Sequence, residues 1–438
     1  MFQRYALPVC LLFVLVVSHF AAISEVRAAS SDRPNVILIM TDDQGYQDVG
    51  CFGHPKIKTP VLDRMADEGV KLTNFYAAAS VCTPTRMGLL TGCYPTRIGW
   101  PGYVLGYRIS HDKGLAPSEV TMAEVFRKAG YATGCFGKWH IGKHPEFLPT
   151  AQGFDTYFGI PYSNNMSPKV LIEGDKISDE KFDNRTLTQR FTEEAIKFVD
   201  KNKDEPFFMY VPYSAPHFPV QPHPDWQGKS DFGAYGDQIE EIDWGVGQIL
   251  ETLKRHKIDE KTLVIFITDN GPQKGEQASA APLRGIKWDS YEGSHRVPCI
   301  MRWPAGLEAG RVSEEIVSMI DLLPTLARAA GVSLDKAIPA DRKIDGLDVW
   351  DAIRGAEGKP GRENLLIWHG QGQFHAIRSG KWKLFPEKKE LYDLSTDISE
   401  EKNVYDQNPE IVARLAATAE VQLKEIEANI RPMATVGK

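Results

Sequence analysis

Five short runs of apolar residues, each bounded by turn residues or charges, limit what this 438-residue chain can fold into. They are rich in β-branched residues and continuously apolar, as strands are when both faces of their sheet are covered. Amphipathic stretches with helical spacing lie between them. This alternation predicts an α/β sheet with helices on both sides. The runs are Val36–Met40, Tyr131–Phe136, Phe207–Pro212, Leu263–Thr268 and Pro298–Arg302.

The two ends of the chain differ from this central part. Arg4 precedes the apolar stretch Ala6–Val17, and small residues follow around Ala28, which predicts a signal peptide over residues 1–28 and an exported, periplasmic or secreted protein. The stretch is shorter than the roughly 20 residues of a membrane span, so no stable span is expected, and an uncleaved anchor is the alternative. We expect the main, catalytic domain over residues 29–355. Shorter alternating runs and a final helix predict a C-terminal antiparallel sheet plus helix subdomain over residues 356–438.

Charge and cysteine content exclude two classes of protein. The net charge of −7 argues against a nucleic-acid partner, because proteins that bind polyanions are usually basic. Beyond the predicted signal peptide the cysteines are too few and of the wrong number for a disulfide scaffold. One of them must stay unpaired, and the sequence leaves the pairing of the others open. They are Cys51, Cys82, Cys93, Cys135 and Cys299.

Polar residues follow four of the predicted strands directly. In open α/β sheets ligands bind beyond the carboxyl ends of the strands, so these side chains can converge on one site although they are far apart in sequence. A single such residue is as readily explained as a turn or cap, but the repetition at four strands weakens that explanation. The residues are Asp42 and Asp43, then Lys138 and His140, then His217, and finally Asp269 and Asn270.

The acidic part of this set predicts a divalent cation. Asp42, Asp43, Asp269 and Asn270 offer only oxygen atoms, and crowded carboxylates repel one another unless a cation lies among them. Hard oxygen ligands suit Ca²⁺ or Mg²⁺ equally well, and no histidine or cysteine spacing points to zinc.

The basic part predicts a pocket for an anion above the metal. Arg86, Lys138, His140, His217 and Lys287 would stabilise charge that develops as an ester bond breaks. The segment that starts at Cys82 connects the two sets, because its proline suits the first turn of a helix, with Thr83 as a possible cap. From the residues alone, Cys82 at a helix N-terminus beside Arg86 indicates an activated thiol at an anion site.

These residues also carry a resemblance to the sulfatase family. The segment Cys82-Thr-Pro-Thr-Arg86-Met-Gly-Leu-Leu90-Thr91-Gly92 resembles the sulfatase signature Cys-x-Pro-x-Arg-x-x-Leu-x-Thr-Gly in full. A second signature is matched by Gly130-Tyr131-Ala-Thr133 leading into Gly137-Lys138-Trp139-His140-Ile-Gly142. The resemblance covers roughly residues 34 to 330 and is greatest to the branch of arylsulfatase A and the galactosamine-6-sulfatases. Further matching blocks contain Asp42-Asp43, Ala215-Pro216-His217, Asp269-Asn270 and Leu283-Arg284-Gly285 before Lys287.

The resemblance implies a fold and a chemistry that the thiol interpretation misses. The fold would be a large mixed, mostly parallel sheet sandwiched by helices, like that of alkaline phosphatase. In this family a maturation enzyme oxidises the cysteine, here Cys82, to Cα-formylglycine, whose hydrated form attacks sulfur and later eliminates sulfate. One calcium ion would be held by Asp42, Asp43, Asp269, Asn270 and the modified Cys82.

The same resemblance assigns roles to the remaining residues. Arg86 would hold the nucleophile, Lys138 and Lys287 would bind sulfate oxygens, His140 would accept the hydroxyl proton, and His217 would protonate the departing alcohol. Ser163 matches a family serine near the nucleophile. Trp288 and His295 stand where the family pattern usually differs, so each is expected either to line the substrate pocket or to serve packing.

The resulting prediction is a sulfuric ester hydrolase that acts on a sulfated carbohydrate. One alternative is a phosphate mono- or diesterase of the same superfamily, which the complete Cys82 signature disfavours because such enzymes typically carry serine or threonine there. Another is an inactive homologue that binds sulfated glycans, which the complete set of catalytic residues disfavours.

Overall fold

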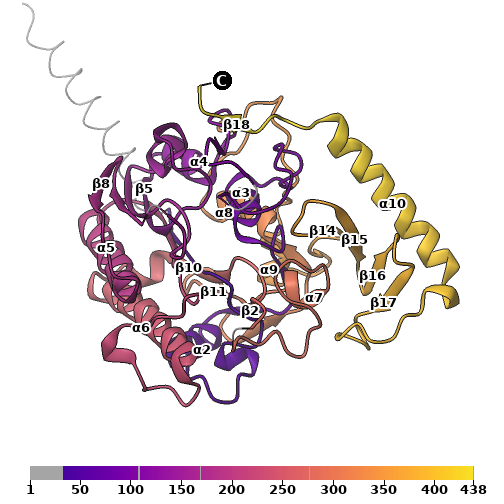
Figure 1. Cartoon of the computed structure of the whole chain (residues 1–438), viewed down its shortest axis with the longest axis horizontal. Coiled ribbons are helices and arrows are strands. Elements are labelled where there is room, and N and C mark those ends of the chain that lie inside the picture. Colours follow the sequence, from indigo (N-terminus) through magenta and orange to yellow (C-terminus); the bar gives the residue numbers. More distant parts are fainter. Residues whose placement is uncertain (1–32, 107–108, 168, 276, 438) are drawn as a thin grey trace, which may run out of the picture.

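The computed structural model describes residues 33–106, 109–167, 169–275 and 277–437 (Figure 1). The predicted signal peptide, residues 1–28, lies outside these ranges. Within them, no helix is both long and apolar enough to cross a lipid bilayer.

A ten-stranded sheet forms the centre of the main part of the chain. Its strand order is β12-β2-β11-β10-β1-β9-β5-β6-β7-β8. The five strands β10, β1, β9, β5 and β6 pair in parallel, and antiparallel strands extend the sheet on both sides. The prediction of a mixed, mostly parallel sheet is therefore confirmed. The bounds are β1 Asn35–Thr41, β2 Val70–Leu72, β5 Ala132–Lys138, β6 Thr156–Ile160, β7 Leu171–Glu173, β8 Lys176–Asp179, β9 Phe207–Pro212, β10 Thr262–Thr268, β11 Cys299–Arg302 and β12 Arg311–Ser313.

Each central strand supplies side chains to two apolar cores, one on each face of the sheet. In β1, Ile37 and Ile39 belong to one core and Leu38 to the other, as the two-residue period of a strand requires. The first core is covered by α2 (Pro60–Asp67), α5 (Leu187–Asn202) and α6 (Gly233–Arg255). The second is covered by α3 (Cys82–Thr91), α4 (Met122–Lys128) and α8 (Leu322–Ala329).

A second, four-stranded antiparallel sheet lies near the C-terminus, covered by the long helix α10 (Pro409–Ala428) (Figure 1). The predicted boundary at residue 355 falls directly after α9 (Trp350–Arg354), where Gly355 adopts φ 76°. As a domain division it stays a prediction, since the apolar core of this sheet is continuous with that of the main sheet. The strands are β14 Asn364–Trp368, β15 Phe374–Ser379, β16 Trp382–Phe385 and β17 Glu390–Asp393.

Short elements complete the described structure. The helix α7 (Glu292–His295) precedes β11 in sequence, and its buried polar residues contact the C-terminal sheet. Two further two-stranded sheets pair distant segments: β3 Phe75–Tyr76 with β13 Val317–Ser318, and β4 Lys113–Gly114 with β18 Ala434–Thr435.

Candidate active site

The acidic residues meet because the strands that precede them are neighbours. β1 and β10 pair in parallel register, with Thr41 opposite Thr268, so the residues that follow both strands lie at the same edge of the sheet. Asp43 adopts a left-handed φ of 64°, and its backbone N–H donates to Asp269 Oδ1 at 3.1 Å. The side-chain amide of Asn270 lies 2.7 Å from Asp43 Oδ1. Asp42 lies beside them, since Arg86 Nη2 is 3.6 Å from Asp42 Oδ1 and 2.8 Å from Asp269 Oδ2, so the four predicted oxygen ligands lie together.

Two further strands bring bases to this cluster. β5 ends at Lys138, whose ammonium group donates to Asp42 Oδ2 at 2.5 Å and to Ser163 Oγ at 3.3 Å. The segment after β9 carries His217, whose Nε2 lies 3.5 Å from Asp43 Oδ2. Lys287 arrives from a loop, and its Nζ lies 2.7 Å from each carboxylate oxygen of Asp43.

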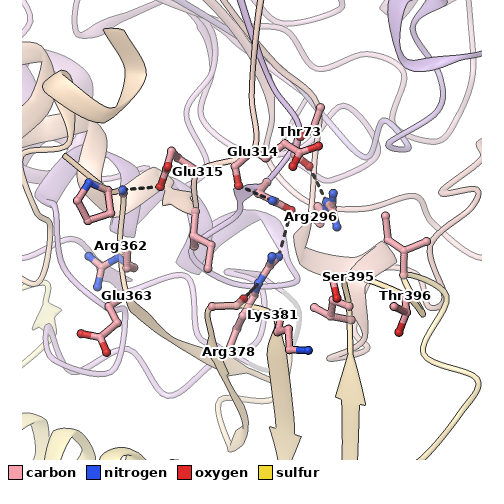
Figure 2. A pocket seen from close by; sticks show the side chains of 17 residues that line it. Thr73, Arg296, Glu314, Glu315, Arg362, Glu363, Arg378, Lys381, Ser395 and Thr396 are labelled. Carbon is pink, nitrogen blue, oxygen red and sulfur yellow. Dashed lines mark hydrogen bonds between the residues drawn. The ribbon is translucent and has the colours of Figure 1, made fainter. Parts of the chain in front are cut away.

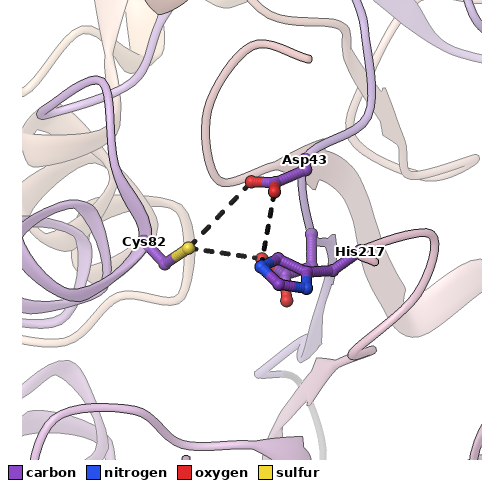
Figure 3. Close-up of side chains that lie close together, drawn as sticks. Asp43, Cys82 and His217 are labelled. Carbon is purple, nitrogen blue, oxygen red and sulfur yellow. Dashed lines mark hydrogen bonds and ion pairs between the residues drawn. The ribbon is translucent and has the colours of Figure 1, made fainter. Parts of the chain in front are cut away.

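Cys82 is the first residue of α3 and points into this group (Figure 3). Its Sγ lies 3.5 Å from Asp42 Oδ1 and 3.2 Å from Lys287 Nζ. One turn further along the helix, Arg86 donates through Nε and Nη2 to Asp269 Oδ2. Thr83 was expected as a possible helix cap, but its hydroxyl instead donates to the carbonyl of His140.

The structure does not support the interpretation of Cys82 as an activated thiol. Its side chain is buried, and burial raises the pKa of the thiol to about 12 although Lys138 and Lys287 act in the opposite direction. A thiol with this pKa is almost entirely protonated at neutral pH, whereas a reactive cysteine needs a thiolate. Burial thus outweighs the nearby lysines, and the site as described does not favour a thiolate at Cys82.

The donor set fits a hard divalent cation. Burial alone would raise the pKa of Asp42, but Lys138, His217 and Arg86 outweigh it and hold that pKa well below its usual value. Burial, and after it the charge of Asp42, raises the pKa of Asp269 to about 7, so a cation among these carboxylates would relieve both effects. Asn270 Oδ1 is buried without a hydrogen-bond partner in the described structure. Carboxylate and amide oxygens of this kind are ligands for Ca²⁺ or Mg²⁺.

Both histidines of the site are buried, and burial favours their neutral forms. Burial lowers the pKa of His217, and it lowers that of His140 well below its usual value. His217 Nδ1 lies 2.6 Å from the carbonyl oxygen of Phe218, so donation from Nδ1 leaves Nε2 facing the carboxylates. His140 has a left-handed φ of 64°, and its buried Nδ1 has no partner among the described residues.

The three predicted substrate-binding residues are placed differently. Ser163 lies in the site, with its Oγ 3.4 Å from His217 Nδ1. Trp288 is half-buried, and its ring centroid is 6.3 Å from that of Tyr103, just after Lys287 in sequence. His295 is not brought to the cluster: its ring is buried and contacts Ser294 Oγ and the carbonyl of Trp368 in the C-terminal sheet. Packing, the alternative left open for it, accounts for these contacts.

One polar residue of the site was missed in the sequence. Asn164 Nδ2 donates to the carbonyl of His217 at 3.2 Å, and its Oδ1 accepts from Ser163 Oγ. Both residues lie shortly after β6, so the same pattern of polar residues beyond a strand end would have found it.

Family models match most of the chain. The model described as Sulfatase matches residues 34–332, and the one described as N-sulphoglucosamine sulphohydrolase, C-terminal, matches residues 287–429. Arylsulfatase A of Homo sapiens is 36% identical, over 80% of this chain and 74% of its own length. The N-acetylgalactosamine-6-O-sulfatase of Bacteroides thetaiotaomicron is 31% identical, over 89% of this chain and 93% of its own length.

Solved structures show the same likeness. One solved structure, of a protein described with the metabolism of multiple glycosaminoglycans by Bacteroides thetaiotaomicron, has a TM-score of 0.80 at 29% identity. The match covers 89% of this chain and 99% of that chain. The crystal structure of Ps i-CgsB with k-i-k-neocarrahexaose has a TM-score of 0.80 at 28% identity, covering 92% and 95%. A phosphonate monoester hydrolase of Agrobacterium radiobacter, at 20% identity and a TM-score of 0.65, shares the fold. The chain belongs to the sulfatase family, and it is a sulfuric ester hydrolase.

Proposed function

We propose that this sulfatase hydrolyses O-sulfate esters of carbohydrates, with Cys82 matured to Cα-formylglycine and one Ca²⁺ ion in the site. The observation that carries the proposal is the position of the Cys82 side chain. It lies between Asp42 and Lys287, among the oxygen ligands and beside two ammonium groups, yet its thiol has the wrong pKa to act itself. A nucleophile derived from this side chain would already stand at the centre of an anion pocket.

The calcium ion would be held by Asp42, Asp43, Asp269, Asn270 and the modified residue 82. When bound, it supplies positive charge that neutralises the sulfate oxygens and offsets the repulsion among the carboxylates. Lys138 and Lys287, which donate to Asp42 and Asp43 in this structure, would also donate to sulfate oxygens. Arg86 keeps its charge while fully buried, because Asp269 accepts two of its N–H groups.

Formylglycine, when present, supplies a hydrated aldehyde whose hydroxyl group is the nucleophile. The protons are moved by the two histidines. His217 presents Nε2 to the cluster, where burial lowers its pKa although Asp42 and Asp43 act in the opposite direction, so a proton on Nε2 would pass readily to a departing alkoxide. His140 lies beside Lys138 and Arg86 with a lowered pKa and an unpartnered Nδ1, which suits a neutral base that accepts a hydroxyl proton.

The proposed substrate class rests on the relatives and on the rim of the site. A relative is named as an N-acetylgalactosamine-6-O-sulfatase, and a similar structure was solved with k-i-k-neocarrahexaose. Trp288 follows Lys287 and pairs with Tyr103, which offers an aromatic surface beside the sulfate-binding lysine. Export to the periplasm or outside the cell, and a maturation enzyme as a partner, belong to the same proposal.

The test is a panel of defined sulfated oligosaccharides, scored for released sulfate with enzyme produced beside a maturation enzyme. Matched phosphate esters should be turned over far more slowly. Peptide mass spectrometry should show residue 82 changed by loss of H₂S and gain of O. Cys51 is the control in the same digest: it is half-buried and more accessible than Cys82, so indiscriminate oxidation would reach it first. Active enzyme with an unmodified Cys82 would refute the mechanism.

A further inference from the structure

A second cavity, of ≈ 820 Å³, lies where the C-terminal sheet meets the main part of the chain (Figure 2). Its wall combines the turn after β2, the end of α7, the segment after β12 and the ends of β15 and β17. None of the candidate active-site residues lines it. Its size is in the range of sites for small organic ligands and well above what a single inorganic ion fills.

Two buried guanidinium groups, those of Arg296 and Arg378, face this cavity. The residues are only 6% and 5% exposed. Arg296 Nε donates to the carbonyl of Thr73, and Arg378 Nε donates to the carbonyl of Gly380. Both Nη1 atoms turn to the same carboxylate oxygen, Glu292 Oε2, at 3.5 and 3.4 Å. Arg378 Nη1 also donates to Asn74 Oδ1 at 3.3 Å, and the guanidinium groups of Arg296 and Arg378 lie over the rings of Tyr46 and Tyr76.

The buried charges behind the cavity do not balance. Glu292 Oε2 also accepts the Tyr76 hydroxyl, and Glu292 Oε1 pairs with Lys383 at 3.0 Å. Lys383 in turn pairs with the buried Glu400. Three cations, namely Arg296, Arg378 and Lys383, therefore share two carboxylates, and an uncompensated buried charge is costly.

The pKa shifts of Glu400 and Arg378 also indicate that positive charge exceeds negative charge in this region. Burial raises the pKa of Glu400 to about 7 despite Lys383, which further reduces the negative charge near neutral pH. Burial lowers the pKa of Arg378 to about 9, as expected where too little negative charge is close by.

Among the described residues, the other acidic residues of the wall form no ion pair with Arg296 or Arg378. Glu315 accepts the backbone N–H of Gly361, while Glu314 and Glu363 are exposed at the rim, where water and salt screen them. The guanidinium of Arg362 is already satisfied by Asp321 and backbone carbonyls. The deep part of the cavity is therefore positive, and its mouth carries hydroxyl groups.

We propose that this cavity is a second anion-binding site, which takes a sulfate or carboxylate group of an acidic saccharide between Arg296 and Arg378. Guanidinium groups bind planar and tetrahedral oxyanions well, and the remaining volume accommodates a sugar whose hydroxyl groups meet Ser395, Thr396 and Glu363. That the anion belongs to a saccharide rests on the proposed function. The anion site itself does not.

The test measures binding by titration calorimetry on full-length protein with Cys82→Ala, which prevents turnover. The probes are sodium sulfate, sodium glucuronate and a chondroitin sulfate tetrasaccharide. Thr396→Glu adds a negative charge at the exposed mouth without touching the buried cluster. Val421→Glu makes the same charge change on α10, at a residue that is 69% exposed and outside the cavity.

We expect two binding events for the tetrasaccharide, one of which is weakened about tenfold or more by Thr396→Glu and by Arg378→Gln, and unchanged by Val421→Glu. Because Arg378→Gln can disturb folding, Thr396→Glu decides. A single binding event, or equal affinities in Thr396→Glu and Val421→Glu, would overturn the site. Sodium sulfate that binds as tightly as the tetrasaccharide would overturn the saccharide as its source. A failure to release sulfate from any oligosaccharide would refute the proposed function and leave this measurement intact.

Discussion

Replacing Gly137 by alanine is a sharp test of how the sheet positions Lys138. Gly137 has a φ of 145°, and a Cβ atom there would lie 2.0 Å from the carbonyl oxygen of Pro212 in β9. Since Cβ contacts under 3.0 Å essentially do not occur, β5 and β9 would have to separate locally by about 1 Å. Overpacking and backbone strain together cost about 2–6 kcal/mol of the free energy of unfolding.

The same displacement moves Lys138, the next residue, away from Asp42. A shift of about 1 Å in a catalytic group costs roughly 10²-fold in rate. We expect kcat for a chromogenic aryl sulfate to fall by that factor, together with a lower thermal unfolding midpoint. The assay needs enzyme matured at Cys82, and the modified fraction should be determined by mass spectrometry for each variant so that loss of maturation is not mistaken for loss of rate.

Gly174→Ala provides the matched control. Gly174 also has a positive φ, of 63°, but it lies in the β7–β8 turn, and no atom lies within 4 Å of the position that an added methyl group would take. Its substitution should cost only about 1–2 kcal/mol of backbone strain and leave kcat unchanged. If Gly137→Ala matches Gly174→Ala in both activity and stability, the close approach of β5 and β9 does not position the lysine as described.

The site and its surroundings support three further predictions. Removal of Ca²⁺ with a chelator should abolish sulfate release and lower the unfolding temperature, with recovery on adding Ca²⁺; full activity in chelator would contradict an oxygen-ligated cation. His217→Gln should lower kcat roughly 10²-fold or more for alkyl and sugar sulfates but much less for aryl sulfates with good leaving groups, and an equal loss for both would rule out proton donation. Burial raises the pKa of Glu241 from 4.5 to about 7, so the folded state binds one more proton than the unfolded state between these pH values. The free energy of unfolding, measured by urea titration at each pH, should therefore fall as the pH rises from 4.5 to about 7. Glu241→Gln should make this pH dependence smaller, and an unchanged pH dependence would contradict the assignment.

The sequence predicted the central strands well because they are continuously apolar. The run Phe207–Pro212 is β9 without any change of bounds, and Leu263–Thr268 differs from β10 by one residue. Shorter strands near the edges of the sheet were missed. β2 (Val70–Leu72) has only three residues with Lys71 in the middle, and its pairing with β11 depends on contacts that local sequence does not encode.

Side-chain orientation and burial were harder to predict than position. Asp43, Lys138 and His217 were found from their places after strands, since register alone brings them together. The protonation of Cys82 was not predictable, because it depends on desolvation by residues from several distant segments. His295 lies close to Lys287 in sequence, but the short helix α7 turns its ring toward Trp368. No local pattern distinguishes these two directions.

The burial of α3 limits when Cys82 is accessible to another protein. All ten residues of this helix are buried, and Cys82 is 1% exposed. A maturation enzyme would have to bind this segment to oxidise the thiol of Cys82. Once the chain has folded, the segment is buried and such an enzyme cannot reach it. If Cys82 is matured as proposed, its oxidation has to precede folding, during synthesis or translocation. On the same proposal, a molecule that folds with its cysteine intact would stay inactive, and only unfolding would expose the cysteine to a maturation enzyme again.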